Sequence, residues 1–237
     1  MNKELQEIEQ WVGLRNKLNN AYAYNEYWQS AIELFETRLN NKFFRPLAMI
    51  ISLKNLEGEG FTMVAVQCAL IESLASFREG KIYKHSKKNT DPLYIYDRSK
   101  EMFVQFLHSD PVFQDNFYRI DMAGNKNNDN PYHAGEFYND VRCGLLHEAR
   151  TKGKWIISAT NKDVKNEKVF LEQKGDKVKI LRTVLHYRLK ECVENYCNDL
   201  KQASVAGATL RRLFARKLDH LFDIGPNPTA YDWWQDR

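Results

Sequence analysis

An arginine and a histidine stand five residues apart in the stretch VRCGLLHEARTKGKW, residues 141–155. Arg142 can hold a phosphate through two parallel hydrogen bonds and stabilise the charge that builds on it. His147 can donate or accept a proton near neutral pH. Metal-free cleavage of RNA needs both functions, because the 2′-hydroxyl loses a proton as it attacks phosphorus and the leaving oxygen gains one. The pair therefore indicates phosphodiester chemistry.

The residues around this pair predict a helix from Ala134 to about Thr151, with one buried face formed by Phe137, Val141, Leu145, Leu146 and Ala149. On an ideal α-helix Arg142 and His147 lie about 140° apart. Asn139, Cys143 and His147 share one face at i, i+4 and i+8. The long side chain of Arg142 can swing over that face, so one pocket is predicted to hold Asn139, Arg142 and His147.

The segment Arg142–His147 has the form R-x4-H in the middle of a predicted helix. This motif, and the wording FYNDVRCGLLHEARTK of residues 137–152, resembles the HEPN superfamily, in particular a bacterial branch found on mobile and defence-associated loci. The resemblance is close over 137–152 and looser over 60–222. It implies a helical up-and-down bundle that dimerises through its motif helices. Many members are metal-independent endoribonucleases of toxin–antitoxin, phage-defence or RNA-processing systems.

Carried onto this chain, the resemblance makes Arg142 and His147 the catalytic pair. Many members have a polar residue, often Asn, directly after the arginine, whereas this chain has Cys143. An acidic or polar residue on an earlier helix often supports the motif, and Glu72 is the candidate here. Asn139, Glu72 and Cys143 are accordingly the predicted supporting residues. A single helix supplies one arginine and one histidine, so a two-fold dimer would supply two of each.

A basic cluster follows the motif directly, formed by Arg150, Lys152 and Lys154. It is a candidate RNA-binding surface. Cations at the end of a helix also complement its macrodipole, so a purely structural role is the competing interpretation. The basic residues Arg211, Arg212, Arg216 and Lys217 on a later helix are open to the same two readings, as phosphate ligands or as a solvated face.

Two alternatives remain open for the motif itself. Arg142 could pair with a carboxylate such as Asp140 or Glu72 while His147 fills the core. The second alternative is a non-catalytic helical module that binds RNA, a nucleotide or a protein, which Cys143 in place of the more usual polar residue favours. A metal site is not predicted, because Cys143 and His147 form at most half a site. The other cysteine pair, Cys192 and Cys197, diverges on a helix at i and i+5. No cofactor is predicted either.

Composition favours a mainly α fold, because only 11 Gly and 6 Pro occur in 237 residues while 43% of residues are hydrophobic. A HEPN-like up-and-down bundle with a small β-hairpin insertion near residues 155–182 is expected. The chain is predicted to form one domain: a helical extension at 1–58, a core at 60–222 and a tail at 223–237. The predicted helices are 4–19, 22–39, 43–53, 61–80 with Thr62 as N-cap and Gly80 as its end, 99–107, 110–120, 134–151, 183–200 and 206–222.

The net charge of +4 permits RNA as a partner. The expected protein partners are a second copy of the chain and an antitoxin or defence protein. The N-terminus is too polar for a signal peptide, and no apolar run is expected to approach the roughly 18 residues of a membrane span. All four cysteines lie in helix-like patterns. These features predict a soluble, cytoplasmic protein without membrane contact.

Overall fold

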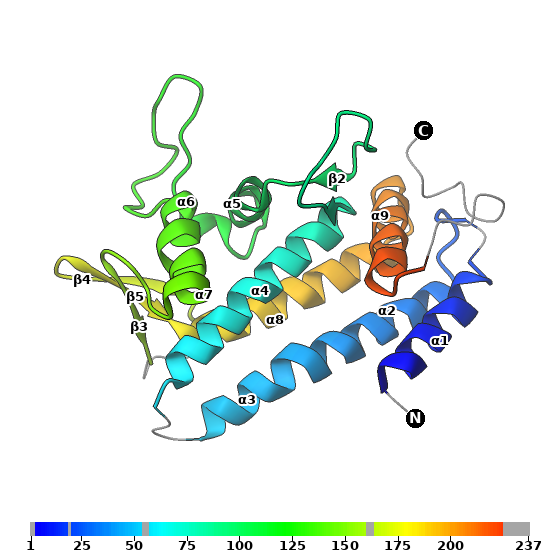
Figure 1. The fold of residues 1–237 in the computed structure, drawn as a ribbon, viewed down its shortest axis with the longest axis horizontal. Coiled ribbons are helices and arrows are strands. Elements are labelled where there is room, and N and C mark those ends of the chain that lie inside the picture. The colour runs from blue at the N-terminus through cyan, green and yellow to red at the C-terminus, as the bar shows by residue number, and fades with distance from the viewer. Residues whose placement is uncertain (1–2, 19, 54–56, 160–163, 225–237) are drawn as a thin grey trace. The chain divides into compact units, whose positions relative to one another are not determined.

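The computed structural model describes residues 3–18, 20–53, 57–159 and 164–224. The described chain is mainly helical with small sheets, as the composition predicts (Figure 1). It divides into two compact units that interleave along the sequence. The first unit comprises residues 1–40, 74–99 and 193–237, and the second comprises 41–73 and 100–192. The assignment of the whole chain to one domain stays a prediction, and most of the tail at 223–237 lies outside the described residues.

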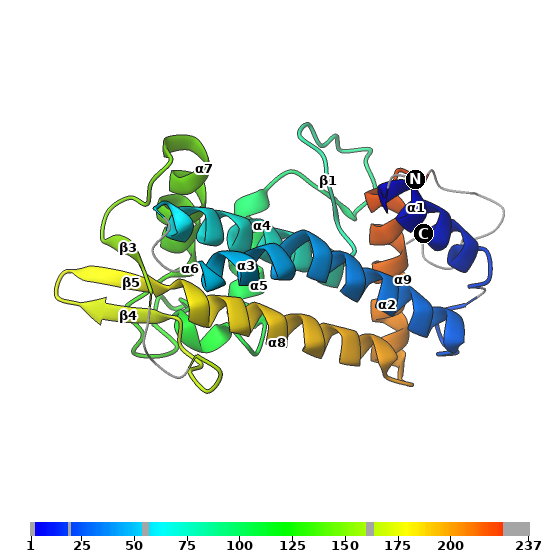
Figure 2. The same cartoon turned by 90° about the horizontal axis from the view of Figure 1, so that it is seen from below.

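The first unit is built from helices and one very short parallel strand pair. Its first two helices, α1 (Lys3–Arg15) and α2 (Glu26–Leu39), pack against each other (Figures 1 and 2). Two helices, α4 (Glu59–Glu79) and α8 (Arg182–Lys201), supply residues to both units. The elements that lie wholly in the first unit are α1 (Lys3–Arg15), α2 (Glu26–Leu39), β1 (Ile82–Tyr83), β2 (Ile95–Tyr96) and α9 (Val205–Leu221).

An aromatic cluster forms the centre of the first unit. Phe35 lies with its ring centroid 4.7 Å from that of Phe77 and 5.4 Å from that of Phe214. Tyr196 completes the cluster at 5.8 Å from Phe35 and donates a hydrogen bond to the carbonyl of Phe77. Rings at these separations and tilts gain edge-to-face attraction in addition to area burial. The cluster therefore holds together segments from four different helices.

Two arginines of α9 are buried and cap other helices, so the interpretation of this face as solvated or phosphate-binding is wrong for both. Arg211 is fully buried, and its guanidinium donates to the carbonyls of Leu200 and Gln202 at the end of α8. Arg216 is 1% exposed and donates to the carbonyl of Gly80 at the end of α4. The last carbonyls of a helix have no intrahelical donor, and these guanidinium groups supply one.

The second unit contains the helix that carries Arg142 and His147, residues 134–148, which is called the motif helix below. It also contains a three-stranded sheet and the helices packed with them. Helix α3 follows α2 through a π-helical turn at Asn40–Phe44, and Pro46 lies in its first turn, where the missing N–H costs no hydrogen bond. The elements wholly in this unit are α3 (Arg45–Ser52), α5 (Ser99–Ser109, apart from its first residue), α6 (Ala134–Glu136), α7 (Gly144–Glu148), β3 (Trp155–Ser158), β4 (Leu171–Lys174) and β5 (Lys177–Leu181).

The predicted β-hairpin is confirmed around Gly175. Strands β4 and β5 pair antiparallel, with Lys174 opposite Lys177, and Gly175 takes a left-handed conformation at the turn. Strand β3 joins β5 in parallel, which makes the insertion a three-stranded sheet of order β3-β5-β4. Rings from the sheet segment pack on the motif helix, since Phe137 lies 5.6 Å from Trp155 and 5.9 Å from Phe170.

Two local predictions are wrong for identifiable reasons. The predicted helix at 110–120 is reduced to a 3₁₀ turn at Gln114–Asn116. The side chain of Asp110 accepts a hydrogen bond from the N–H of Val112, and this local bond competes with helix formation. Thr62 is not an N-cap, because α4 begins at Glu59 and the N–H of Thr62 already donates to Gly58.

Helix α4 shows that the expectation of no apolar run approaching the length of a membrane span is wrong. It is, within the described ranges, the one helix long and apolar enough to cross a membrane by length and composition. More than half of that window, 56%, is buried, as in a core helix of a soluble protein. Gly80, with a positive φ, ends the helix as predicted. The cytoplasmic location stays a prediction.

Candidate functional site

The motif helix runs continuously from Ala134 to Glu148, but its middle is not α-helical. Residues Phe137–Cys143 form a π-helical segment between α6 and α7. A π-turn closes its hydrogen bonds from i to i+5, so residues at i and i+4 no longer stack as they do on an α-helix. Asn139 is exposed, and in the described part of the chain no hydrogen bond joins it to Arg142 or His147. The predicted stripe through Asn139 is therefore not formed.

The helix ends three residues earlier than predicted, because the chain turns back on itself. Ala149 takes a left-handed conformation with φ 54°, and the N–H of Lys152 then donates to the carbonyl of Asp140. A side chain on Gly144 would put its Cβ only 2.6 Å from the carbonyl oxygen of Arg150. Glycine at 144 thus lets the basic segment fold tightly against the helix that carries the motif.

Arg142 is held by Glu72 from α4. Its Nη2 donates to Oε2 of Glu72 at 2.9 Å, and the two side chains are 18% and 25% exposed. The guanidinium also lies over the ring of Tyr138, with its carbon 5.3 Å from the centroid. Burial acts to lower the pKa of Arg142, but the hydrogen bond and charge of Glu72 outweigh it and raise that pKa. The guanidinium is fixed and permanently charged.

The Arg142–Glu72 pair leaves hydrogen-bonding capacity unused. Nε of Arg142 and Oε1 of Glu72 are both buried without a hydrogen-bond partner. Buried polar atoms in folded proteins are nearly always bonded, so two unpartnered atoms at one position leave room for a water molecule or a ligand to complete the pair. Cys143 lies beside them with its sulfur 4.0 Å from Nη1 of Arg142.

The thiol of Cys68, one turn before Glu72 on α4, lies near the same charges. Burial raises the pKa of Cys68, and the carboxylate of Glu72 raises it further, against a smaller opposing effect of Arg142. Cys68 is therefore a neutral thiol with no nucleophilic character at neutral pH. Among the described residues no three His, Cys, Asp or Glu side chains are grouped so that they could hold a metal ion.

His147 lies on the exposed last turn of the motif helix, five residues after Arg142. The neighbouring Leu146, predicted to face the core, is 54% exposed. Ala149 is exposed as well, because the helix has already ended there. The last turn thus presents an imidazole and an apolar side chain together on the surface.

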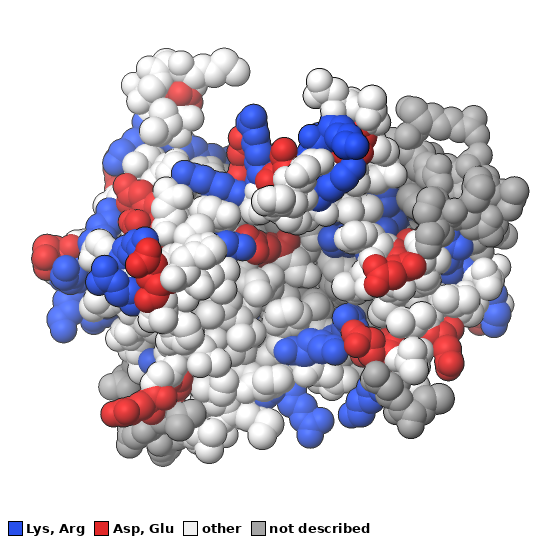
Figure 3. Space-filling model, in the orientation of Figure 1, with Lys and Arg blue, Asp and Glu red and all other residues white. Residues whose placement is uncertain are grey.

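The basic cluster is partly neutralised by neighbouring carboxylates. Lys152 pairs with Glu148 at 2.9 Å, and Lys154 pairs with Glu136 at 3.0 Å. Arg150 is exposed. Lys and Arg side chains alternate with Asp and Glu side chains over the region of α7 and the β3–β5 sheet (Figure 3). The surface beside the motif is mixed in sign, with Arg150 as its freest cation among the three.

The structure also brings together two histidines that spacing alone did not connect. The ring of His108 on α5 lies 5.5 Å from that of His133, which directly precedes the motif helix. They are 25 positions apart in the sequence, and their contact depends on how the intervening loop folds. The sequence signals that bear on this contact are the helical periodicity of residues 99–107 and the predicted start of a helix at residue 134, and neither predicts the path of the loop.

Comparison with known proteins gives no match: no protein-family model, no curated protein and no solved structure is similar to this chain.

Proposed function

We propose that the chain is a metal-independent endoribonuclease of HEPN type, acting as a toxin or as a phage-defence or stress ribonuclease. The observation that carries this proposal is the Arg142–Glu72 pair on the helix whose exposed last turn holds His147. A guanidinium fixed by a carboxylate of another helix, with an accessible imidazole five residues on, supplies a phosphate ligand and a proton-transfer group. The R-x4-H resemblance points to the same assignment.

In this mechanism Arg142 binds the scissile phosphate and stabilises the charge that develops on its oxygens. His147 takes the proton of the 2′-hydroxyl as that oxygen attacks phosphorus. The 5′-oxygen leaves with a proton from the second imidazole of a two-fold dimer, which gives a 2′,3′-cyclic phosphate and a 5′-hydroxyl. The exposed Leu146 supplies apolar area for such a dimer beside His147. Arg150 and its neighbours would contact the RNA backbone.

The test is RNA cleavage by purified protein carrying Arg142→Ala or His147→Ala. Both variants should lose cleavage while their circular dichroism and thermal unfolding show a folded protein. His85→Ala is the matched control, because His85 is exposed in the first unit and outside the motif. Equal cleavage by wild type and His147→Ala would contradict the proposal.

A second candidate function rests on the same ion pair. Arg142 is bonded to Glu72, and such a pair also serves to tie two helices together without catalysis. In that case the chain is a non-catalytic helical module that binds RNA, a nucleotide or a partner protein. The two variants would then lower stability or binding, and no RNA would be cleaved by any form of the protein.

A further inference from the structure

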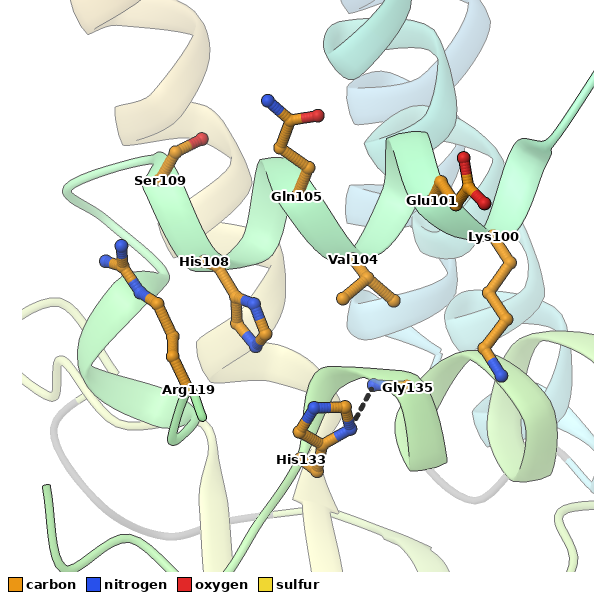
Figure 4. A pocket seen from close by; sticks show the side chains of 9 residues that line it. All are labelled: Lys100, Glu101, Val104, Gln105, His108, Ser109, Arg119, His133 and Gly135. Atoms are coloured by element: carbon orange, nitrogen blue, oxygen red, sulfur yellow. Dashed lines mark hydrogen bonds between the residues drawn. The ribbon is translucent and has the colours of Figure 1, made fainter. Parts of the chain in front are cut away.

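A cleft of about 740 Å³ lies within the second unit, between α5 and the segment that leads into the motif helix (Figure 4). None of the proposed catalytic residues lines it. Its volume falls in the range of small-molecule sites and exceeds what a single phosphate would fill. The lining residues are Lys100, Glu101, Val104, Gln105, His108, Ser109, Arg119, His133 and Gly135.

His133 has a fixed orientation in this cleft. Its Nδ1 accepts a hydrogen bond from the N–H of Gly135 at 3.1 Å and so caps the motif helix. A nitrogen that accepts carries no proton, so the proton of the neutral ring is on Nε2. A Cβ at position 135 would lie 2.8 Å from Nδ1, so glycine is what lets the imidazole approach. His133 therefore offers one N–H donor to the cleft.

His108 offers the opposite function. Its side chain points toward His133 (Figure 4), and its Nε2 is buried without a hydrogen-bond partner. Burial lowers the pKa of His108 to about 4, and the neighbouring His133 and Arg119 add to this effect. The ring is neutral at neutral pH. Because Nε2 has no partner, we assign the interaction of the ring with the backbone of Tyr118, and with it the ring proton, to Nδ1. Nε2 is then a lone-pair acceptor that lacks a donor, which is an uncommon condition for a buried atom.

The cleft also carries excess positive charge. Arg119 donates from Nη2 to Gln114 at 3.3 Å, and its Nε is buried without a partner. Lys100 extends along the cleft, with its Cε 3.7 Å from the position of a Cβ on Gly135. Glu101 is the one carboxylate in the lining. Two cations and an imidazole donor against one carboxylate favour an anionic ligand.

We propose that this cleft binds a phosphate ester that carries a neighbouring hydroxyl, the chemistry of a nucleotide or of an RNA terminus. Arg119 and His133 donate to the phosphate oxygens, and His108 accepts from the sugar hydroxyl. Lys100, at the other end of α5 (Figure 4), adds positive charge to the same cleft. Arginine suits this role because its N–H groups match phosphate oxygens in geometry. The remaining volume accommodates ribose and base. The site is separate from Arg142 and His147, and it does not depend on their being catalytic.

The experiment follows the histidine ring resonances of the full chain by NMR during titration with 5′-AMP, adenosine and inorganic phosphate. The resonances of His108 and His133, assigned from single-substitution variants, should shift with 5′-AMP. Adenosine should shift neither. Inorganic phosphate should shift them with lower affinity, because it lacks the sugar hydroxyl that His108 accepts from.

Arg119→Gln should weaken 5′-AMP binding about tenfold, which is the loss expected for one charge-assisted contact. Lys100→Gln should weaken it by a smaller factor, because it removes a charge at the other end of the cleft. Arg45→Gln is the matched control, because Arg45 is an exposed cation of the same unit outside the cleft. Lys100 is exposed, so its substitution keeps the test valid if Arg119→Gln is unfolded. Adenosine binding as tightly as 5′-AMP, or unchanged 5′-AMP affinity in both variants, would overturn the proposal.

The two sources of the ligand are separated by competition. The competition uses His147→Ala protein, so that the RNA stays intact. If a 5′-phosphorylated single-stranded RNA displaces 5′-AMP and its unphosphorylated counterpart does not, the cleft binds RNA ends. Displacement by neither oligomer, with 5′-AMP still bound, assigns it to a free nucleotide. Because the readout is binding, it stands or falls separately from RNA cleavage.

Discussion

Nη2 of Arg142 lies 2.9 Å from Oε2 of Glu72, and this bond joins the π-helical part of the motif helix to α4. The carboxylate fixes the plane of the guanidinium, while Nε of the arginine remains buried without an acceptor. An arginine held in this way costs little further ordering when it meets a phosphate. The proposed role of Arg142 as a phosphate ligand depends on this pair.

The energetic coupling of this pair should exceed that of an ordinary surface pair. In a double-mutant cycle of urea unfolding, Arg142→Ala and Glu72→Ala should show a coupling of about 1 to 2 kcal/mol, because both side chains are mostly buried. The control cycle uses Lys154 and Glu136, whose side chains are 38% and 44% exposed. That pair should couple by about 0.5 kcal/mol or less. Equal coupling in the two cycles would show that the Arg142–Glu72 bond is not formed as described.

Gly144→Ala should destabilise the protein by about 1 to 3 kcal/mol, because the new Cβ would press on the Arg150 carbonyl 2.6 Å away and displace the basic segment. Gly13→Ala is the control. Gly13 lies in α1 with no atom within 4 Å of the added Cβ, and it should gain about 0.5 to 1 kcal/mol from helix propensity. Thermal and urea unfolding measure the change in the free energy of unfolding for each variant. An unchanged value for Gly144→Ala would mean that the segment around Arg150 does not fold back on the helix.

Arg211→Lys should lower the free energy of unfolding by about 2 kcal/mol or more, although the charge is kept. The guanidinium of Arg211 donates to carbonyls of Ala21, Leu200 and Gln202, and a single ammonium cannot reach all of them. Arg150→Lys, on the exposed surface, should leave stability within about 0.5 kcal/mol. Chemical denaturation measures the free energy of unfolding of both variants. A change in Arg211→Lys as small as that in Arg150→Lys would mean that Arg211 is not part of the core.

Stability should fall as pH drops from about 6.5 toward 4, partly through His186. This side chain is 3% exposed and lies against the ring of Phe44, and burial lowers its pKa to about 4, with a smaller contribution from Lys190. The unfolded chain takes up a proton on this imidazole below about pH 6.5, whereas the folded chain does so only near pH 4. Since the unfolded state binds more protons in this window, the free energy of unfolding decreases as pH falls.

The expected contribution of His186 is a loss of about 1 to 2 kcal/mol between pH 7 and pH 5. Urea unfolding at the two pH values measures it. His186→Leu should flatten the pH dependence, whereas His85→Leu, at an exposed position, should keep it. The half-buried His108 contributes with the same sign, so some slope will remain in His186→Leu. An unchanged slope in that variant would contradict the assignment.

The long helices and the hairpin could be predicted from the sequence because their signals are local. A segment that is apolar nearly all round and is followed by Gly80 predicts α4, and the Lys174-Gly175-Asp176 turn predicts the hairpin. The π-helical segment could not be predicted, because no residue of FYNDVRC distinguishes an i+5 from an i+4 hydrogen bond by type. It is this segment that separates Asn139 from the predicted pocket.

The environment of charged side chains was the least predictable part. Arg211 and Arg216 are buried because the open helix ends of α8 and α4 need donors, and that need exists only once those helices are placed. His108 and His133 meet for a similar reason, through the path of the loop between them. Glu72 could be proposed as the partner of Arg142 because it is the one carboxylate before the last turn of the predicted helix at 61–80.

The measurement that tests the central claim most directly is cleavage of a bulk RNA mixture by wild type and His147→Ala in EDTA, with the product ends analysed. The proposal predicts cleavage by wild type alone, leaving 2′,3′-cyclic phosphate and 5′-hydroxyl ends. Loss of wild-type cleavage in EDTA, products with 5′-phosphate ends, or undiminished cleavage by His147→Ala would each contradict a metal-free mechanism centred on this histidine.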